Sequence, residues 1–205
     1  MSKILIVIPT FENITPDTFK SIYNLHKPCA CDFDFVRGYD CATARNNIAR
    51  RALNWDYDYV FMVDSDIILP NHALTTLLQD HHDKDVVVGY YPKHTGQRGE
   101  TCVYKLGEYN FTQAYTIPEL KEHADPELSA SPLIQIHGAG MGCALIKTIV
   151  FEKINYPWFD WVNYKDGGNL SEDLYFCKRC KETGIDIFVD TRVGCGHIVR
   201  GVRWE

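Results

Sequence analysis

Short apolar runs without a polar interruption recur along the chain, and they constrain its fold more than any other feature. Residues 3–8, 58–63 and 85–91 form such runs, and 32–37 alternates as a further strand would. A strand that is apolar at nearly every position is buried on both faces, which is typical of parallel sheets covered by helices. Amphipathic segments that fit helices lie between the runs, at 16–26, 43–55 and 70–80. This alternation predicts a parallel α/β fold.

The helix expected at 43–55 has a distinct apolar face, and Thr43 is its expected N-cap. The buried side is predicted to hold Ala44, Ile48, Ala49, Ala52 and Leu53, whereas Arg45, Asn46, Arg50 and Arg51 fall elsewhere on the helix. The second half is less regular. It has strand-like residues at 133–146, a helix expected at 171–183 and a strand at 185–189.

Length and composition favour one folded domain over residues 1–205. A chain of 205 residues can bury a sizeable core but is too short for two ordinary domains. Hydrophobic residues make up 45% and charged residues 23%, which excludes disordered and collagenous chains. The net charge of −6 argues against broad, charge-driven binding to nucleic acid or to an anionic membrane.

The apolar runs are also too short for a membrane span, which needs ~20 residues. The first run is shorter than the apolar core of a signal peptide and stops at Pro9 without a small-residue cleavage site. Without an export signal, the eight cysteines are expected to be reduced thiols. Cys177 and Cys180 are expected to pack in the core rather than bind zinc. These points predict a cytoplasmic protein.

Asp64-Ser65-Asp66 directly follows the run 58–63 and is the most informative site in the chain. Residues two apart on an extended segment point the same way, and ligand crevices form at the carboxyl ends of strands in open α/β sheets. Two carboxylates there repel each other unless a cation such as Mg²⁺ or Mn²⁺ lies between them. The alternatives are solvated turn aspartates and the nucleophile motif of haloacid-dehalogenase-like phosphatases, which normally follows the first strand.

Three later segments add candidate groups. Ser171-Glu172-Asp173 opens a helix, where acids suit the helix dipole but where one of them could also be a general base beside the aromatic and glycine residues of 158–168. His197 is either a structural residue or a ligand for Mn²⁺. The glycine-rich loop at 137–142 allows a ligand to approach the backbone, but it lacks the Lys-Ser/Thr of a P-loop.

Taken in order, these segments resemble small glycosyltransferases of the GT-A fold, particularly the family 2-like group, over nearly the whole chain. The matching segments are IVIPTF, ATARNNIA, VDSDI, HGAGMGCALIK, SEDLYFCKRC and CGH. The resemblance implies a Rossmann-like single domain with a mostly parallel central sheet flanked by helices. It also implies a nucleotide-binding half at 1–91 and an acceptor and catalytic half at 92–205.

The resemblance assigns roles to individual residues. Those implied in binding the nucleotide sugar are Pro9, Thr10, Glu12, Arg45, Asp64, Ser65, Gly138, Ala139 and Gly140. Those implied in binding the metal are Asp64, Asp66 and His197. Asp173 is the implied catalytic base, with Glu172 beside it, and the dipole of its helix is expected to favour the charged form.

The sequence therefore predicts a metal-dependent glycosyltransferase. It would transfer a sugar from a nucleoside diphosphate sugar to a hydroxyl of a glycan or glycoconjugate, using Mn²⁺ or Mg²⁺ and inverting the anomeric centre. UDP is favoured as the nucleotide because it is frequent in the family. Two alternatives stay open: a Mg²⁺-dependent phosphatase or nucleotidyltransferase that uses the same acidic pair, and a catalytically dead module that binds a nucleotide sugar.

Overall fold

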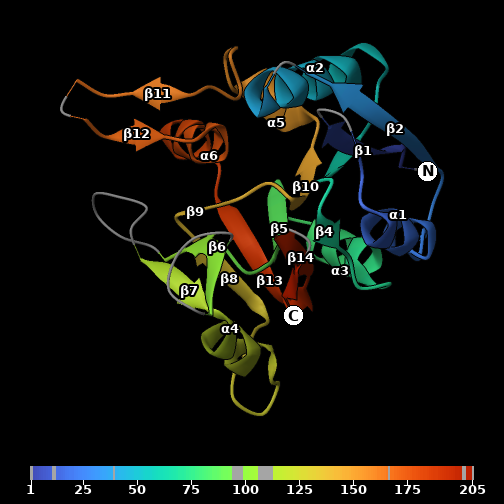
Figure 1. Ribbon diagram of the computed structural model, residues 1–205, viewed down its shortest axis with the longest axis vertical. Coiled ribbons are helices and arrows are strands. Elements are labelled where there is room, and N and C mark those ends of the chain that lie inside the picture. The colour runs from blue at the N-terminus through green and yellow to red at the C-terminus, as the bar shows by residue number, and fades with distance from the viewer. Residues whose placement is uncertain are drawn as a thin grey trace.

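The structure is a computed structural model that describes residues 2–10, 13–38, 40–93, 99–105, 113–165, 167–199 and 202–204. Over these residues the chain forms a mixed α/β fold, with a large sheet between two layers of helices (Figure 1). The helices are α1 (Pro16–Tyr23), α2 (Cys41–Asn54), α3 (Ala73–Asp80), α4 (Ile117–Ala124), α5 (Ile149–Lys153) and α6 (Glu172–Glu182). None of those in the described ranges is both long enough and apolar enough to cross a membrane.

Seven strands of the described residues form the central sheet, in the order β2-β1-β3-β10-β5-β13-β8. In that order their bounds are Cys31–Arg37, Ile4–Thr10, Tyr59–Val63, Cys143–Lys147, Val86–Tyr90, Ile187–Gly194 and Leu133–Ile136. β10, from 92–205, lies between β3 and β5, which are both from 1–91, so the two halves share one sheet.

The sheet is mixed, and the expectation of a mostly parallel sheet is wrong. β1 pairs in parallel with β2 and β3, and β13 pairs in parallel with β5. β10, however, lies between β3 and β5 and is antiparallel to both, and β8 is antiparallel to β13. The residues Cys143 to Ile146 of β10 are all buried. A strand buried on both faces has no alternation that would indicate its direction, so its sequence fits either orientation.

Helices cover both faces of the sheet and form two hydrophobic cores. Alternate residues of β1 show this division, because successive side chains of a strand point to opposite faces. Leu5 and Val7 belong to the core beneath α2, α5 and α6, whereas Ile4, Ile6 and Ile8 belong to the core beneath α1 and α3. The helices of each core lie on their own side of the sheet in Figure 1.

Helix α2 begins earlier than its sequence indicates. Asp40 is the N-cap and accepts a hydrogen bond from the backbone N–H of Thr43, so the expectation that Thr43 is the cap is wrong. The structure also places Arg45 and Asn46 among the buried residues of α2. The amphipathic pattern leaves both off the apolar face, but each has polar partners that are distant in sequence.

Three smaller units surround the sheet. One pairs β14 (Gly196–Val199) with both β15 (Val202–Trp204) and β4 (Ile67–Ile68). A second pairs β6 (Glu100–Tyr104) with both β7 (Ala114–Thr116) and β9 (Gly138–Ala139). The hairpin of β11 (Val162–Asn163) and β12 (Asn169–Leu170) extends away from the body beside α6 (Figure 1).

Candidate functional site

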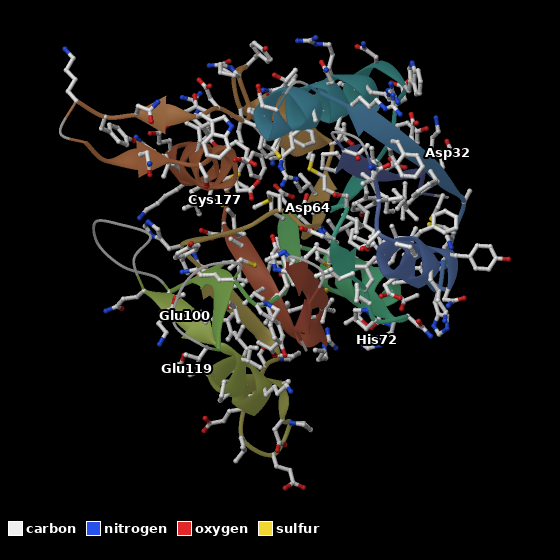
Figure 2. All side chains as sticks on the ribbon, in the orientation of Figure 1. Asp32, Asp64, His72, Glu100, Glu119 and Cys177 are labelled. Atoms are coloured by element: carbon white, nitrogen blue, oxygen red, sulfur yellow. The ribbon has the colours of Figure 1, made fainter. Side chains whose placement is uncertain are left out.

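Several of the residues singled out from the sequence meet at one edge of the central sheet. Asp64 follows the last residue of β3, and Gly142 precedes the first residue of β10. Because β10 is antiparallel to β3, its beginning lies beside the end of β3, and the Asp64 N–H donates to the Gly142 carbonyl at 3.1 Å. Figure 2 shows Asp64 near the middle of the molecule. This is the carboxyl edge of the parallel strands, where α/β sheets bind ligands.

Arg45 joins the two acidic motifs. Its Nη2 donates to both carboxylate oxygens of Asp64, at 3.0 and 3.3 Å. Its Nε lies 3.0 Å from Asp173 Oδ1 and 3.6 Å from Glu172 Oε1. These four residues are called the Arg45 cluster below. The Arg45 side chain is only 2% exposed, so the structure directs it into the protein toward carboxylates and not toward solvent.

The Arg45 cluster has more negative than positive charge, because three carboxylates surround one guanidinium. Burial alone lowers the pKa of Arg45, but the carboxylates of Asp173, Asp64 and Glu172 outweigh it and hold the pKa well above its usual value. The guanidinium therefore stays charged. The excess of negative charge makes this edge of the sheet favourable for a cation.

The pKa of Asp173 is raised, to about 7. Burial is the largest cause; the guanidinium of Arg45 opposes it, and the carboxylates of Glu172 and Asp64 add to it. The helix dipole was expected to favour the charged form of Asp173. That expectation is wrong for the net shift, because burial favours the neutral form more strongly. Desolvation of a carboxyl can shift its pKa by several units, whereas a helix terminus contributes at most ~2 kcal/mol.

Asp66 and His197 form a second, separate pair. His197 Nε2 lies 3.4 Å from Asp66 Oδ2, and Ile67 pairs with His197 between β4 and β14. On the other side of the ring, Nδ1 lies 2.7 Å from the Pro92 carbonyl oxygen. A proton on Nδ1 donates to that carbonyl, which assigns the lone pair of the neutral ring to Nε2, the nitrogen that faces Asp66. Burial lowers the pKa of His197, but the hydrogen bonds that the protonated ring donates to Asp66 and to the Pro92 carbonyl outweigh it and raise the pKa.

The metal ligands implied by the family resemblance are only partly brought together. Within the described ranges, no group of three or more His, Cys, Asp or Glu side chains is placed to hold a metal. The Asp64 carboxylate contacts Arg45, while Asp66 and His197 face each other. A carboxylate oxygen and an imidazole nitrogen that face each other suit Mn²⁺, and two protein ligands suffice where substrate phosphates complete the coordination. Asp66 and His197 therefore fit such a cation.

The glycine-rich loop packs against Tyr91, a residue that the sequence did not single out. Gly138 and Ala139 are in β9, and the Gly140 N–H donates to the Cys102 carbonyl at 2.9 Å. A Cβ atom at Gly140 would overlap the Tyr91 hydroxyl. Packing inside the protein is therefore sufficient reason for glycine at this position.

Asn46 is a second residue whose part in the site the sequence does not reveal. Its Nδ2 donates to the Phe159 carbonyl at 2.7 Å, and its Oδ1 accepts from the backbone N–H groups of Trp158 and Phe159 at 3.1 and 3.2 Å. The Phe159 ring in turn stacks on Phe176 of α6, with centroids 4.7 Å apart. Asn46 thus fixes the aromatic segment beside α6. The amphipathic pattern leaves Asn46 off the apolar face of the helix, so no local signal in the sequence indicates this role.

The remaining candidates lie near the end of β1. Pro9 and Thr10 are the last residues of that strand and are buried, and the Thr10 hydroxyl donates to the Asn13 carbonyl at 3.2 Å. The Ser65 carbonyl accepts from the Thr15 N–H at 3.0 Å, which ties the Asp64–Asp66 turn to the beginning of α1. Glu12 lies outside the described residues.

No protein-family model matches this sequence, and no curated protein matches it either. Among solved structures, the chain is similar to the crystal structure of A197 from STIV, with a TM-score of 0.63 and 18% sequence identity. The match covers 98% of this chain and 87% of that chain. At this level of identity the similarity concerns the fold alone, and it extends over nearly the whole α/β architecture.

Proposed function

We propose that this protein is a metal-dependent glycosyltransferase of the GT-A type that transfers a sugar from a nucleoside diphosphate sugar to a hydroxyl group. The observation that carries the proposal is the convergence of the Asp66–His197 pair and the Arg45 cluster at the end of β3. Their members come from four segments of the sequence: Arg45, Asp64 with Asp66, Glu172 with Asp173, and His197. A divalent-cation site beside a carboxyl with a pKa near neutrality is what transfer of a sugar from a diphosphate to a hydroxyl requires.

Asp66 and His197 are the residues proposed to hold Mn²⁺ or Mg²⁺. When bound, the cation would neutralise the charge that develops on the departing diphosphate. The hydrogen bond from His197 Nδ1 to the Pro92 carbonyl fixes the ring so that Nε2 stays directed at Asp66. Such outer contacts keep a metal ligand in the correct orientation and tautomer.

Asp173 is the proposed general base. Its pKa of about 7 suits proton transfer at neutral pH better than an ordinary carboxyl does, because a base works best when its pKa is near the working pH. It would take the proton from the acceptor hydroxyl while that oxygen attacks the anomeric carbon. A single displacement of this kind inverts the anomeric centre.

Arg45 is proposed to organise the two acidic motifs rather than to bind the nucleotide. It contacts Asp64 at the end of β3 and Asp173 in the first turn of α6, and these contacts fix the distance between the strand and the helix. Its charge also offsets part of the repulsion among the three carboxylates. Without it, bringing these acids together in a half-buried site would be strongly unfavourable.

We place this activity in the cytoplasm. In the part of the chain that the structure describes, all eight cysteines are free thiols, and Cys102, Cys143, Cys177, Cys180 and Cys195 are buried. Buried thiols persist most readily in a reducing compartment.

The experiment is a transfer assay with UDP-, GDP- and dTDP-sugars, Mn²⁺ and a panel of sugar acceptors, in which mass spectrometry detects the product. Asp173→Asn should retain donor binding but turn over ~10²–10⁴-fold more slowly, the usual cost of losing a general base. Glu182→Gln, at the exposed far end of the same helix, is the matched control and should keep full activity.

Product analysis distinguishes the alternatives. An α-linked donor should give a β-glycoside by NMR, and a retained configuration would overturn the single displacement. Release of free phosphate without transfer would instead indicate a phosphatase. Tight donor binding with no turnover would indicate a binding module.

A further inference from the structure

Tyr91 lies between the two ends of the proposed site, at the point where β5 ends. Its side chain is only 6% exposed. The hydroxyl contacts the glycine-rich loop, while the ring and the following residue, Pro92, contact His197. No polar motif marks this tyrosine, since it is the last residue of an apolar run.

On the loop side, the Tyr91 hydroxyl occupies the space that side chains at positions 140 and 142 would need. Tyr91 Oη accepts a hydrogen bond from the Gly142 N–H at 3.0 Å. A Cβ at Gly142 would lie 2.8 Å from both Tyr91 Oη and Asp64 Oδ2, and a Cβ at Gly140 would overlap Tyr91 Oη. Both glycines therefore leave the space that the phenol occupies. The Gly142 carbonyl, in turn, accepts from the Asp64 N–H at 3.1 Å.

On the metal side, the same residue restrains the imidazole of His197. The two rings meet edge to face, with centroids 5.4 Å apart and an interplanar angle of 76°. The carbonyl of Pro92, next in the chain, lies 2.7 Å from His197 Nδ1. The Tyr91 ring and the Pro92 carbonyl together hold the His197 imidazole in one orientation, in which Nε2 faces Asp66.

We infer that Tyr91 is a positioning residue that ties the Asp66–His197 pair to the Gly140–Gly142 loop. The contacts run from Asp64 to Gly142, Tyr91, His197 and Asp66. The backbone from Asp64 to Asp66 closes this path. A path closed in this way keeps the cation-binding pair and the loop at a fixed separation, and a displacement of about 1 Å can cost ~10²-fold in rate. The role in cation binding rests on the proposed function, whereas the packing of Tyr91 against the loop does not.

The first test is a double-mutant cycle on thermal stability, which requires no activity. Gly140→Ala should lower the melting temperature by about 3–10 °C, because the new methyl group overlaps the Tyr91 hydroxyl. In a Tyr91→Phe background the hydroxyl is gone, and the nearest atoms to the methyl are then Cys102 Cβ and the ring carbon Cζ, at 3.3 Å. The same substitution should there cost less than half as much.

Tyr90→Phe is the matched control for this cycle. Tyr90 is equally buried, at 6% exposure, but it belongs to the core on the opposite face of the sheet, and its hydroxyl lies over Gly194. In the Tyr90→Phe background, Gly140→Ala should cost as much as in the wild type. Additive effects of Gly140→Ala and Tyr91→Phe would overturn the assigned contact.

The second test measures Mn²⁺ binding by electron paramagnetic resonance, with UDP present. Tyr91→Phe keeps the ring and should bind Mn²⁺ within about threefold of the wild type. Tyr91→Leu removes the ring and should weaken binding about 10–100-fold, as the loss of an outer contact typically does. Circular dichroism confirms that the variants compared are folded, and Tyr91→Phe with Gly140→Ala still tests the role if Tyr91→Leu does not fold.

The two possible failures are distinguishable. A wild type that binds no Mn²⁺ would overturn the proposed function, together with the metal side of this inference. A wild type that binds Mn²⁺ while a folded Tyr91→Leu binds it equally well would overturn the role of Tyr91 alone.

Discussion

Removing the guanidinium of Arg45 is the substitution that we expect to destabilise the site most. Arg45→Met keeps the length of the side chain and its apolar character but removes the only cation that contacts Asp64, Glu172 and Asp173 among the described residues. The side chains of these three acids are 27%, 7% and 17% exposed, so water reaches them only in part. The substitution therefore leaves three carboxylates close together without a counter-charge.

The expected cost is about 3–5 kcal/mol, the usual range when one partner of a buried ion pair is removed. Coulomb repulsion among the acids adds to desolvation, so a value near the upper end is expected at high pH. This is a large share of the total stability of a domain, which is about 5–15 kcal/mol. The variant should still fold under mild conditions.

The loss should also depend on pH in a defined direction. The folded-state pKa of Asp173 is already about 7, and loss of the guanidinium raises it further. The corresponding pKa of the unfolded chain is about 3.9. A raised folded-state pKa means that the folded state holds the proton more tightly, so the folded state loses stability as the pH rises through that pKa. The cost of Arg45→Met should therefore be greater at pH 8 than at pH 5.5.

Urea denaturation followed by tryptophan fluorescence at both pH values measures this free energy. Arg50→Met is the matched control, because Arg50 is on the same helix but is exposed and lies over the Tyr156 ring. It should change stability by at most about 0.5 kcal/mol. An Arg45→Met variant as stable as the wild type at pH 8, or one that loses more at pH 5.5, would refute the electrostatic reasoning.

Two further predictions concern buried polar residues. Asn46→Leu should destabilise the protein by about 2–4 kcal/mol in urea denaturation, because it leaves the Phe159 carbonyl and two backbone N–H groups without their partner; a loss below about 1 kcal/mol would show that these groups find other partners. Burial lowers the pKa of His81 to about 4, against the hydrogen bonds to the Lys84 and Leu145 carbonyls, which raise it. Below the unfolded pKa of about 6.5 the unfolded chain takes up a proton that the folded protein does not, so about 3 kcal/mol of stability should be lost between pH 6.5 and 4. His81→Gln should remove this dependence, whereas a wild-type stability that stays flat over the range would show that the two carbonyls keep the ring protonated.

Much of the fold follows from local patterns. The run 3–8 corresponds to β1 at Ile4–Thr10, 58–63 to β3 at Tyr59–Val63 and 85–91 to β5 at Val86–Tyr90. The helix expected at 171–183 is α6, with Ser171 as its N-cap. These elements were predictable because burial of a strand on both faces and the apolar periodicity of a helix depend on residues near one another in the chain.

The remaining features depend on partners that are distant in sequence. Whether β10 is parallel or antiparallel to β3 depends on the path of the chain between them, which the composition of Cys143–Lys147 does not record. Arg45 is buried only because Asp64 and Asp173 surround it, 19 and 128 residues away. Tyr91 carries no polar motif, so its contacts with Gly142 and His197 become visible only when the strands are aligned.

The central claim is that Asp66 and His197 hold a divalent cation for a nucleoside diphosphate. Isothermal titration calorimetry of UDP, GDP and dTDP, each with Mn²⁺ or with EDTA, tests it directly in the wild type, in Asp66→Asn and in a surface control, Asp83→Asn, whose carboxylate is 76% exposed. In the wild type, at least one nucleotide should bind ~10-fold or more tightly with Mn²⁺ than with EDTA, because the proposed ligands Asp66 and His197 are both present. Asp66→Asn should abolish this gain, and Asp83→Asn should keep it. Binding that is equal with Mn²⁺ and EDTA, or equal in Asp66→Asn and the wild type, would contradict the claim.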